Sequence, residues 1–361
     1  MTHPIRSAVA VGLFALGTIA ADEPAKTKTY TVVTPKQEAI DATGINARGE
    51  IVGFQWMPEN GNPDILYEAP IVARGAEITI LPLLKGYTAN FPAAISDDGL
   101  VVGRVSKPAP PNVFVNLRNQ AYVWDRKGGI RGLGAPEGDT ASFATGISRD
   151  GRRISGISVG NYRLRGCLWE RDGDDWKSVV VPEADALGSN VLAISADGKR
   201  LAAVQRGLSM LWTETAPGVW KREILSSEPN ALIPRGGNDA GMIVGRREDN
   251  EGHTSAVVWT REGGLKTLDA PPGYDHANAS AVNNAGVVVG QIDGPHGSKI
   301  GPHAFVYEDG RLRILSEGGP NFVAATAIND ADQITGVFEK EEAEAPDADA
   351  ADLPAKPEKT P

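Results

Sequence analysis

The phrase GINARGEIVG, at Gly44 to Gly53, recurs along the chain as AISDDGLVVG, GISRDGRRISG, AVNNAGVVVG and AINDADQITG. Aligned, the copies place Asn or Ser in one column, at Asn46, Ser96, Ser148, Ser195, Asn238, Asn283 and Asn329. Three residues later comes a second column, at Gly49, Gly99, Gly151, Gly198, Gly241, Gly286 and Asp332. Type I turns favour Asn, Asp or Ser at their first position and Gly at their fourth. The repeat therefore predicts seven structural turns.

Each predicted turn joins two apolar runs, such as Ile45 before the first turn and Ile51-Val52 after it. This pattern is typical of a β-hairpin. The fifth copy, RGGNDAGMIVG, is the weakest because Gly237 stands where the apolar residue belongs. A second hairpin lies between successive copies, and its first strand ends in an aromatic residue, at Trp124, Trp169, Trp212, Trp259 or Tyr307.

The second turn column spans residues 49 to 332, so its six intervals average about 47 residues. Four strands per period at this spacing predict an all-β fold, a single β-propeller with seven blades at residues 29–338. Six blades would be complete and four-stranded. The closing blade would combine Thr29 to Val33 with Ala327 to Phe338. The alternative is six full blades with loose flanking strands.

The two ends of the chain differ from the repeats. Residues 1–21 carry Arg6, an apolar run and then small residues, which is the pattern of a secretory signal peptide. A short linker at 22–28 follows. Residues 339–361 are acidic and almost free of large apolar side chains, which predicts a disordered tail. We therefore expect an exported protein, in the periplasm, the cell envelope or the medium.

Bulk composition excludes several classes. The formal net charge of −10 argues against nucleic acid as a partner. No segment after the leader is long and apolar enough to span a membrane. The single cysteine, Cys167, rules out a disulfide framework and is most simply a buried thiol. A monomer is expected.

The stretch PHAFVYEDGRLRIL, from Pro302 to Leu315, resembles the HAF-repeat family of predicted extracellular repeat proteins, named for the His-Ala-Phe seen here at residues 303–305. LGAPEGDTASFATGISRDG, from Leu133 to Gly151, is similar to that family's link between repeats. The resemblance covers about residues 29–338, although one copy alone carries HAF intact. It implies an exported repeat protein and supplies no catalytic residue.

In such a ring the repeat turns lie on one face, called here the turn face, and the longer loops lie on the other, called the loop face. Variable loops on a rigid scaffold are where binding usually resides. Candidate ligand-binding residues on the loop face are Trp56, Tyr87, Arg104, Tyr162, Arg163, Arg246, Tyr274 and His276. These side chains suit stacking on sugar rings or pairing with an acidic polysaccharide. The competing interpretation is that they cap the blades and are solvated.

Catalytic motifs are not evident. No nucleophile elbow, zinc-protease motif, phosphate loop or dinucleotide fingerprint occurs, so no cofactor is expected. Four of the five histidines, His253, His276, His296 and His303, fall in two adjacent repeats. Their spacing favours loop anchoring over metal binding, so no metal site is predicted. A hydrolase would need paired carboxylates, or a Ser, His and acid set, at the centre of the ring.

Three functional hypotheses follow. The leading one is an exported, noncatalytic propeller that binds a protein or glycan through its loop face, or serves as a scaffold. The alternative is a propeller enzyme, a glycan lyase or hydrolase, that acts at the centre of the ring. The third is a structural envelope protein whose tail mediates contact. The ligand cannot be deduced from the sequence.

Overall fold

The computed structural model describes residues 28–35, 40–59, 62–108, 118–160, 163–182, 189–296, 298–315, 317–319 and 321–339. These residues form β-strands and contain no α-helix. None of them therefore belongs to a helix that could cross a membrane. The predicted signal peptide and all of the predicted tail except Glu339 lie outside the described residues.

The strands repeat in a fixed order. The first strand of each repeat is β2 (Ile40–Ile45), β6 (Ala89–Ile95), β10 (Ala141–Ile147), β14 (Ser189–Ile194), β18 (Ile233–Gly237), β22 (His276–Val282) or β26 (Phe322–Ile328). The second is β3 (Ile51–Glu59), β7 (Val101–Ser106), β11 (Arg153–Gly160), β15 (Arg200–Gln205), β19 (Ile243–Glu248), β23 (Val288–Asp293) or β27 (Gln333–Phe338). The third is β4 (Asn62–Arg74), β8 (Asn119–Asp125), β12 (Arg163–Asp172), β16 (Leu208–Ala216), β20 (Thr254–Thr260) or β24 (His303–Glu308). The fourth is β5 (Glu77–Ile80), β9 (Gly129–Gly132), β13 (Asp175–Val180), β17 (Val219–Ser226), β21 (Gly264–Thr267) or β25 (Arg311–Ile314).

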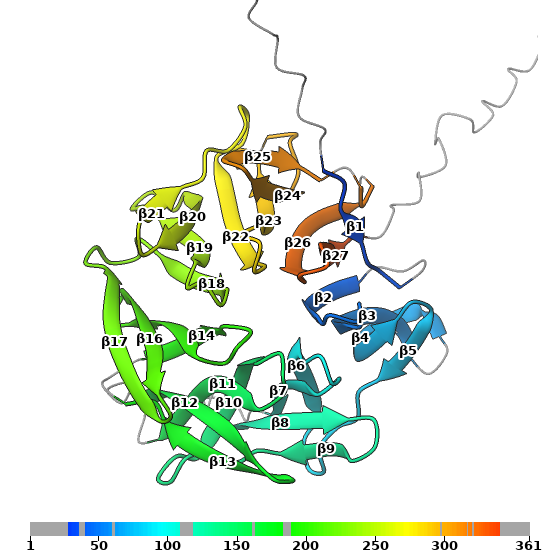
Figure 1. The fold of residues 1–361 in the computed structure, drawn as a ribbon. Coiled ribbons are helices and arrows are strands. Elements are labelled where there is room, and N and C mark those ends of the chain that lie inside the picture. The colour runs from blue at the N-terminus through cyan, green and yellow to red at the C-terminus, as the bar shows by residue number, and fades with distance from the viewer. Residues whose placement is uncertain are drawn as a thin grey trace, which may run out of the picture.

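The sheets stand in a ring around a common axis, with the first strands innermost (Figure 1). Five sheets are four-stranded, and each runs in chain order from its first strand to its fourth. The remaining sheet has seven strands and joins β2 to β5 with β26, β27 and the short N-terminal strand β1 (Thr31–Val32). The predicted all-β propeller is confirmed by this arrangement.

The hydrophobic core is divided among the spaces between neighbouring sheets. One cluster packs Val102 and Val123 of one sheet against Ile154 and Trp169 of the next. Equivalent clusters occur around the ring, including one between the last repeat and the first, where Phe338 packs beside Ile40. Each sheet thus covers a face of its neighbour, which is how a sheet that cannot bury itself alone becomes stable.

A β-bulge interrupts every innermost strand, three residues before the Asn or Ser of the turn. In each case the residue at this position has no partner in the second strand, and β26 has a further unpaired residue, Val323. The residues at this position are Thr43, Ala93, Thr145, Leu192, Arg235, Ser280 and Thr326. Bulges of this kind re-aim a side chain and are common next to functional sites.

Next to the bulge, the second strand carries a glycine in six of the seven repeats, at Gly53, Gly103, Gly156, Gly245, Gly290 and Gly336. Ala203 takes this place in the fourth repeat. At each of these six glycines an added Cβ would overlap a carbonyl oxygen of the innermost strand. The glycine that ends each copy of the repeated phrase is thus explained by close backbone approach and not by the turn.

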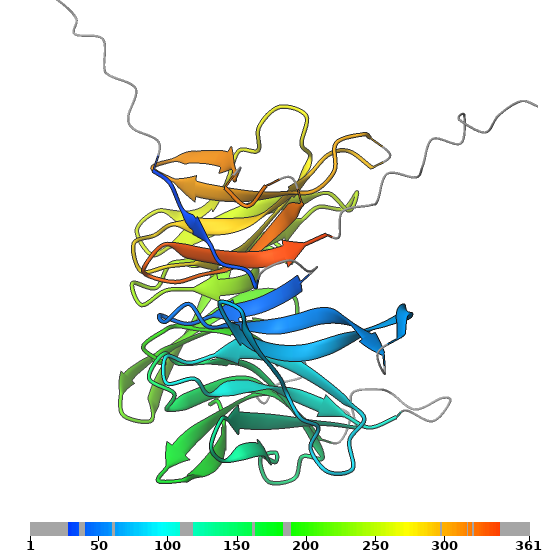
Figure 2. The ribbon, with the colours of Figure 1, turned by 90° about the vertical axis from the view of Figure 1, so that its right-hand side faces the viewer.

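The N-terminal strand β1 pairs with β27 of the last repeat. It runs parallel to β27, as the fourth strand of a blade runs relative to the second. However, it lies directly beside β27, in the position that a third strand takes in the other sheets. In Figure 2 it crosses the side of the ring next to β27. Both ends of the described chain therefore meet in one sheet.

Side chains hold β1 in place. Tyr30 is 3% exposed, and its hydroxyl donates to Glu308 Oε2 at 2.6 Å. Lys28 Nζ lies 3.1 Å from Glu308 and 2.9 Å from Asp332. The hydrogen bond from Tyr30 lowers the pKa of the Glu308 carboxyl, with further help from Lys28, although burial acts against it. Glu308 is therefore held ionised.

Acidification should loosen this strand. Because the pKa of Glu308 is lower in the folded state, its contribution to stability is present above the unfolded-state pKa and is lost as pH falls through the folded-state pKa. We expect Glu308→Gln to lower the free energy of unfolding by about 1 kcal/mol at neutral pH, and the difference from wild type to vanish on acidification. Urea unfolding across pH measures it, with Glu262→Gln on an exposed turn as control. Parallel pH curves for Glu308→Gln and wild type would contradict this account.

Candidate functional site

The turn face is built from the repeated phrase. In the first copy Gly49 N donates to Asn46 O at 3.1 Å, and Gly49 has φ of 72°. The Asn46 side-chain oxygen accepts from Arg48 N at 3.0 Å and Glu50 N at 2.9 Å. In the serine copies the hydroxyl oxygen takes the place of the amide oxygen, for example accepting from Leu100 N at Ser96 Oγ, at 3.0 Å. The turn residues thus satisfy their own backbone amides.

The turns also bond to one another around the whole ring. Where the first position is Asn, its amide usually reaches the next turn: Asn46 Nδ2 donates to Ser96 O at 3.0 Å, and Asn329 Nδ2 donates to Asn46 O at 2.9 Å, which closes the circle. Where it is Ser, a backbone amide does so instead. The remaining links are Asp97 N to Arg149 O, Arg149 N to Ala196 O, Asp197 N to Asp239 Oδ1, Asn238 Nδ2 to Asn283 O, and Asn283 Nδ2 to Asn329 O.

Charged side chains meet on the turn face. The Arg149 guanidinium bonds Asp330 Oδ2 at 2.5 Å, across 181 residues of sequence, and lies 3.7 Å from Asp97. Asn284 Nδ2 donates to both Asp239 Oδ2, at 2.8 Å, and Asp330 Oδ2, at 3.1 Å. These two carboxylate oxygens therefore lie about 6 Å apart or less, near the spacing used by retaining glycosidases.

The chemistry of this pair is nevertheless structural. Burial acts to raise the pKa of Asp330, but hydrogen bonds from Arg149 and Asn284 outweigh it and hold the pKa below its usual value. A general acid needs the opposite shift. The other oxygens of the two carboxylates accept backbone amides of neighbouring turns, at 2.9 Å for Asp330 and 2.7 Å for Asp239. The acidic groups on the turn face therefore hold the ring together.

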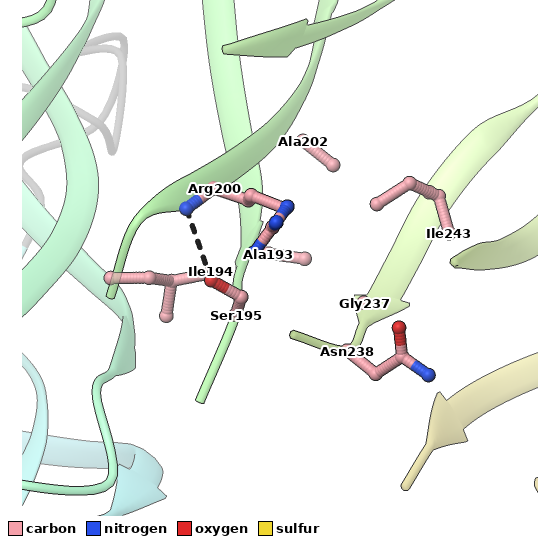
Figure 3. A pocket seen from close by; sticks show the side chains of 8 residues that line it. All are labelled: Ala193, Ile194, Ser195, Arg200, Ala202, Gly237, Asn238 and Ile243. Carbon is pink, nitrogen blue, oxygen red and sulfur yellow. Dashed lines mark hydrogen bonds between the residues drawn. The ribbon is translucent and has the colours of Figure 1, made fainter. Parts of the chain in front are cut away.

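A hollow on the turn face follows from the weakest repeat copy. It lies between the fourth and fifth repeats and contains about 160 Å³ of empty space, open solvent included (Figure 3). Gly237 lines it, at the place that Ile194 and other aliphatic residues take in the other copies. The hollow is too narrow to seat a water molecule. It reflects a missing side chain and is not a ligand site.

Toward the loop face, several polar side chains on the first and second strands of the sheets lack hydrogen-bond partners within the described ranges, unlike those of the turn face. Arg235, the bulged residue of β18, is exposed and makes no hydrogen bond or ion pair with the described residues. Although the residue is exposed, the surrounding protein partly desolvates its guanidinium, and this, followed by the positive charge of Arg246, lowers its pKa. Arg246 Nε is buried without an acceptor, and its nearest carboxylate is Glu248 at 3.6 Å. Asn278 Oδ1 on β22 is likewise buried without a donor.

Two more polar side chains stand at comparable positions on the inner strands of other sheets, Asp41 in the first repeat and Arg104 in the second. Together with Arg235, Arg246 and Asn278 of the fifth and sixth repeats they are here called the loop-side cluster, a name for their shared place in the repeat and not for mutual contact. Asp41 on β2 occupies the repeat position of Asn278, five residues before the turn. Its carboxyl has no hydrogen-bond partner among the described residues, and burial raises its pKa. Arg104 lies 4.4 Å from the Phe91 ring and 5.9 Å from the Phe143 ring, and burial lowers its pKa.

The remaining predicted ligand-binding residues fare differently from one another. Trp56 is 41% exposed on the β3–β4 ribbon, which projects beyond the neighbouring sheets in Figure 2. The Tyr87 hydroxyl donates to Gln120 Oε1 at 2.6 Å. Arg163 is exposed at the start of β12. Tyr162 lies outside the described residues.

The histidines gather on the loop face of the fifth and sixth repeats. The rings of His253 and His276 lie 5.6 Å apart, and Tyr274 lies 5.9 Å from His303. His253 Nδ1 is 3.2 Å from Asp249, and His276 Nδ1 accepts from Thr254 N at 3.4 Å. Across the described ranges no serine hydroxyl bonds a histidine, and no group of three metal-binding side chains converges. Cys167 is fully buried, which raises the pKa of its thiol.

Sequence reasoning found Arg104 and Arg246 but missed Asp41, Arg235 and Asn278. All three missed residues lie on innermost strands. An alignment of the copies would have revealed Arg235, because it stands three residues before a turn, where the other copies have Thr, Ala, Leu or Ser. Asp41 and Asn278 stand where other copies have Phe91 or Phe143.

The chain matches no model of a known protein family, and no curated protein is similar to it in sequence. Solved structures are similar in fold. The β-propeller domain of the Trilobed protease from Pyrococcus furiosus is 10% identical, with a TM-score of 0.50 over 81% of this chain and 89% of that one. A puromycin-hydrolysing peptidase from Mycobacterium tuberculosis is 15% identical, with a TM-score of 0.44 over 80% of this chain. This chain spans 56% of that peptidase. The putative TolB of Agrobacterium tumefaciens is 13% identical, with a TM-score of 0.44 over 66% of this chain and 84% of that one.

The fold is that of a β-propeller, as in the Trilobed protease domain. The leading hypothesis of a noncatalytic binding or scaffold module was wrong by this comparison, because the similar propeller belongs to a protease. The alternative, a propeller enzyme, agrees with it better. At these identities the likeness itself extends to the fold alone.

Proposed function

We propose that this chain is a β-propeller enzyme of the hydrolase class, whose reaction takes place at the loop-side cluster. One observation carries the proposal: the two halves of the ring use their polar groups differently. The turn-face residues bond one another in a closed circle. The side chains of Asp41 and Arg235 make no hydrogen bond with the described residues, and Asn278 Oδ1 is buried without a donor, which is costly for a polar atom. Groups that the fold leaves unpaired are available to a substrate.

Each of these side chains suits a role in hydrolysis. Because burial raises the pKa of Asp41, its carboxyl stays protonated to a higher pH than an exposed one, as a general acid requires. Asp41 would donate its proton to the leaving group while water attacks the scissile bond. Arg235 and Arg246 would bind a negatively charged group of the substrate and so position it. The class of reaction agrees with the propeller of the protease above.

The test is turnover by the full chain on panels of glycans and peptides, followed as new reducing ends or new amino groups. We expect hydrolysis in one panel, and Asp41→Asn to slow it by about 100-fold or more. The rate should also fall as pH rises through the raised pKa of Asp41, because the acid form is lost. Asp269→Asn, an exposed carboxyl beyond β21, is the control and should keep wild-type activity. A folded protein that hydrolyses neither panel would refute the proposal.

Two finer points of architecture join this proposal. We propose that β26, β27 and β1 count as a seventh, three-stranded blade, supported by the pairing of β1 with β27 and by the seven linked turns. We also propose an exported protein of HAF-repeat type with a cleaved leader at residues 1–21 and an acidic tail. Support for export comes from the pattern of that leader.

A further inference from the structure

We propose that the substrate is an acidic polysaccharide and that Arg235, Arg246 and Asn278 bind the carboxylate and a neighbouring hydroxyl of one uronic acid unit. This inference rests on the proposed hydrolase function and names the substrate class of the same site. Its starting point is a local excess of positive charge in a protein whose formal net charge is −10. Arg246 on β19 lies opposite Ile233 on β18, two residues before Arg235, and β22, which carries Asn278, packs against both strands. Bulk composition therefore does not account for the pair.

Two like charges held together need a partner. The fold supplies little: Arg235 has no carboxylate partner among the described residues, and Glu248 stays 3.6 Å from Arg246. Guanidinium groups bind carboxylates through paired, charge-assisted hydrogen bonds. An anionic ligand would relieve the repulsion and supply the acceptor that the buried Arg246 Nε lacks.

The two unpaired atoms also restrict which anionic ligands fit, because one needs an acceptor and the other a donor. Arg246 Nε needs an acceptor, whereas Asn278 Oδ1 needs a donor. An ionised carboxylate or a phosphate dianion only accepts, so neither alone satisfies both atoms. A uronic acid carries a carboxylate and hydroxyl donors on one ring. An acidic peptide offers backbone N–H donors instead of hydroxyls, so the comparison with an oligoglutamate below tests which of the two the site takes.

Flat ring surfaces on the same face agree with a sugar ligand. Thr254 N, which bonds His276, belongs to the strand that pairs with β19, the strand of Arg246. His276 and Asn278 are two residues apart on β22, so their side chains lie on the same face of the sheet. The paired rings of His253 and His276 therefore lie farther along the strands that carry Arg246 and Asn278, toward the loop face. Rings of this kind can stack on a pyranose.

The test measures binding and turnover in the same samples of the full chain. The probes are a galacturonate oligosaccharide, its fully methyl-esterified form and an oligoglutamate of similar length. By titration calorimetry we expect the acid sugar to bind at least about tenfold more tightly than the other two probes. Arg235→Met should weaken that binding by about tenfold, and Asn278→Ala by somewhat less. Arg311→Met, on the outermost strand β25, removes the same charge elsewhere and should change nothing.

The outcomes separate this inference from the proposed function. Equal binding of the acid and ester sugars, or unchanged binding by a folded Arg235→Met variant, would overturn the carboxylate site. Tighter binding of oligoglutamate would overturn the glycan and indicate an acidic peptide. Binding of the acid sugar without new reducing ends would leave the site standing and refute the hydrolase. Hydrolysis of neutral glycans alone would leave the hydrolase standing and overturn the uronic acid site.

Discussion

Gly290→Ala is expected to lower the free energy of unfolding by about 3 kcal/mol, a large fraction of the stability of a domain. The added Cβ would overlap the carbonyl oxygen of Asn278 on the innermost strand and would lie 2.7 Å from Phe305, which is fully buried. Neither neighbour can give way cheaply, because one is backbone and the other fills the space between two sheets. Equilibrium urea unfolding measures the change as a shift of the midpoint.

Gly301→Ala is the matched control for this substitution. An added Cβ at Gly301 would have no heavy atom within 4 Å, and its backbone does not take a positive φ. We expect Gly301→Ala to change stability by less than about 0.5 kcal/mol. If Gly290→Ala were as mild as this control, the close approach at the bulge would not constrain the fold.

The glycine column shows where sequence reasoning stopped. The turn column could be predicted because Asn46 and Gly49 act within a few residues of each other, so their chemistry is visible in one short phrase. Gly53 closes the same phrase, yet its reason lies on the opposite strand: an added Cβ would overlap the backbone of Asp41 and Ala42. A bulge is a relation between two strands, so a single strand does not reveal it. Ala203 shows that the rule has one exception in this chain.

The candidate site was predicted only in part for a related reason. Arg104 and Arg246 follow the same Gly of their second strands and could be found by reading toward the loops. Arg235 and Asn278 lie on innermost strands, and neither was predicted as a ligand-binding residue. Whether a side chain on such a strand is exposed or half-buried depends on the bulge and on the neighbouring sheet. The sequence therefore predicted the ring and its period, but not which innermost residues remain unpaired.

The turn column also carries a second function that its local chemistry hides. Asparagine and serine are equivalent as turn residues, since both accept backbone amides of their own turn. They differ in whether the side chain also bonds to the turn of the next repeat. Asn46 Nδ2 donates to Ser96 O of the next repeat at 3.0 Å and to Glu50 Oε2 at 2.7 Å, whereas a serine hydroxyl at this position bonds within its own turn. The choice between them thus decides how one turn is joined to the next.

Asn46→Ser is accordingly expected to lower the free energy of unfolding by about 2 to 3 kcal/mol, even though serine keeps the turn. The variant loses the bond to the next repeat and one partner of Glu50, whose side chain is 7% exposed and would keep Arg48 at 2.7 Å. Ser195→Ala is the control: it removes only bonds within a turn and should cost about 1 kcal/mol. Urea unfolding of both variants gives the comparison. If Asn46→Ser cost no more than Ser195→Ala, the bonds between turns would add nothing to stability. The larger cost would mean that each asparagine in the repeated phrase stabilises two turns, its own and the next one around the ring.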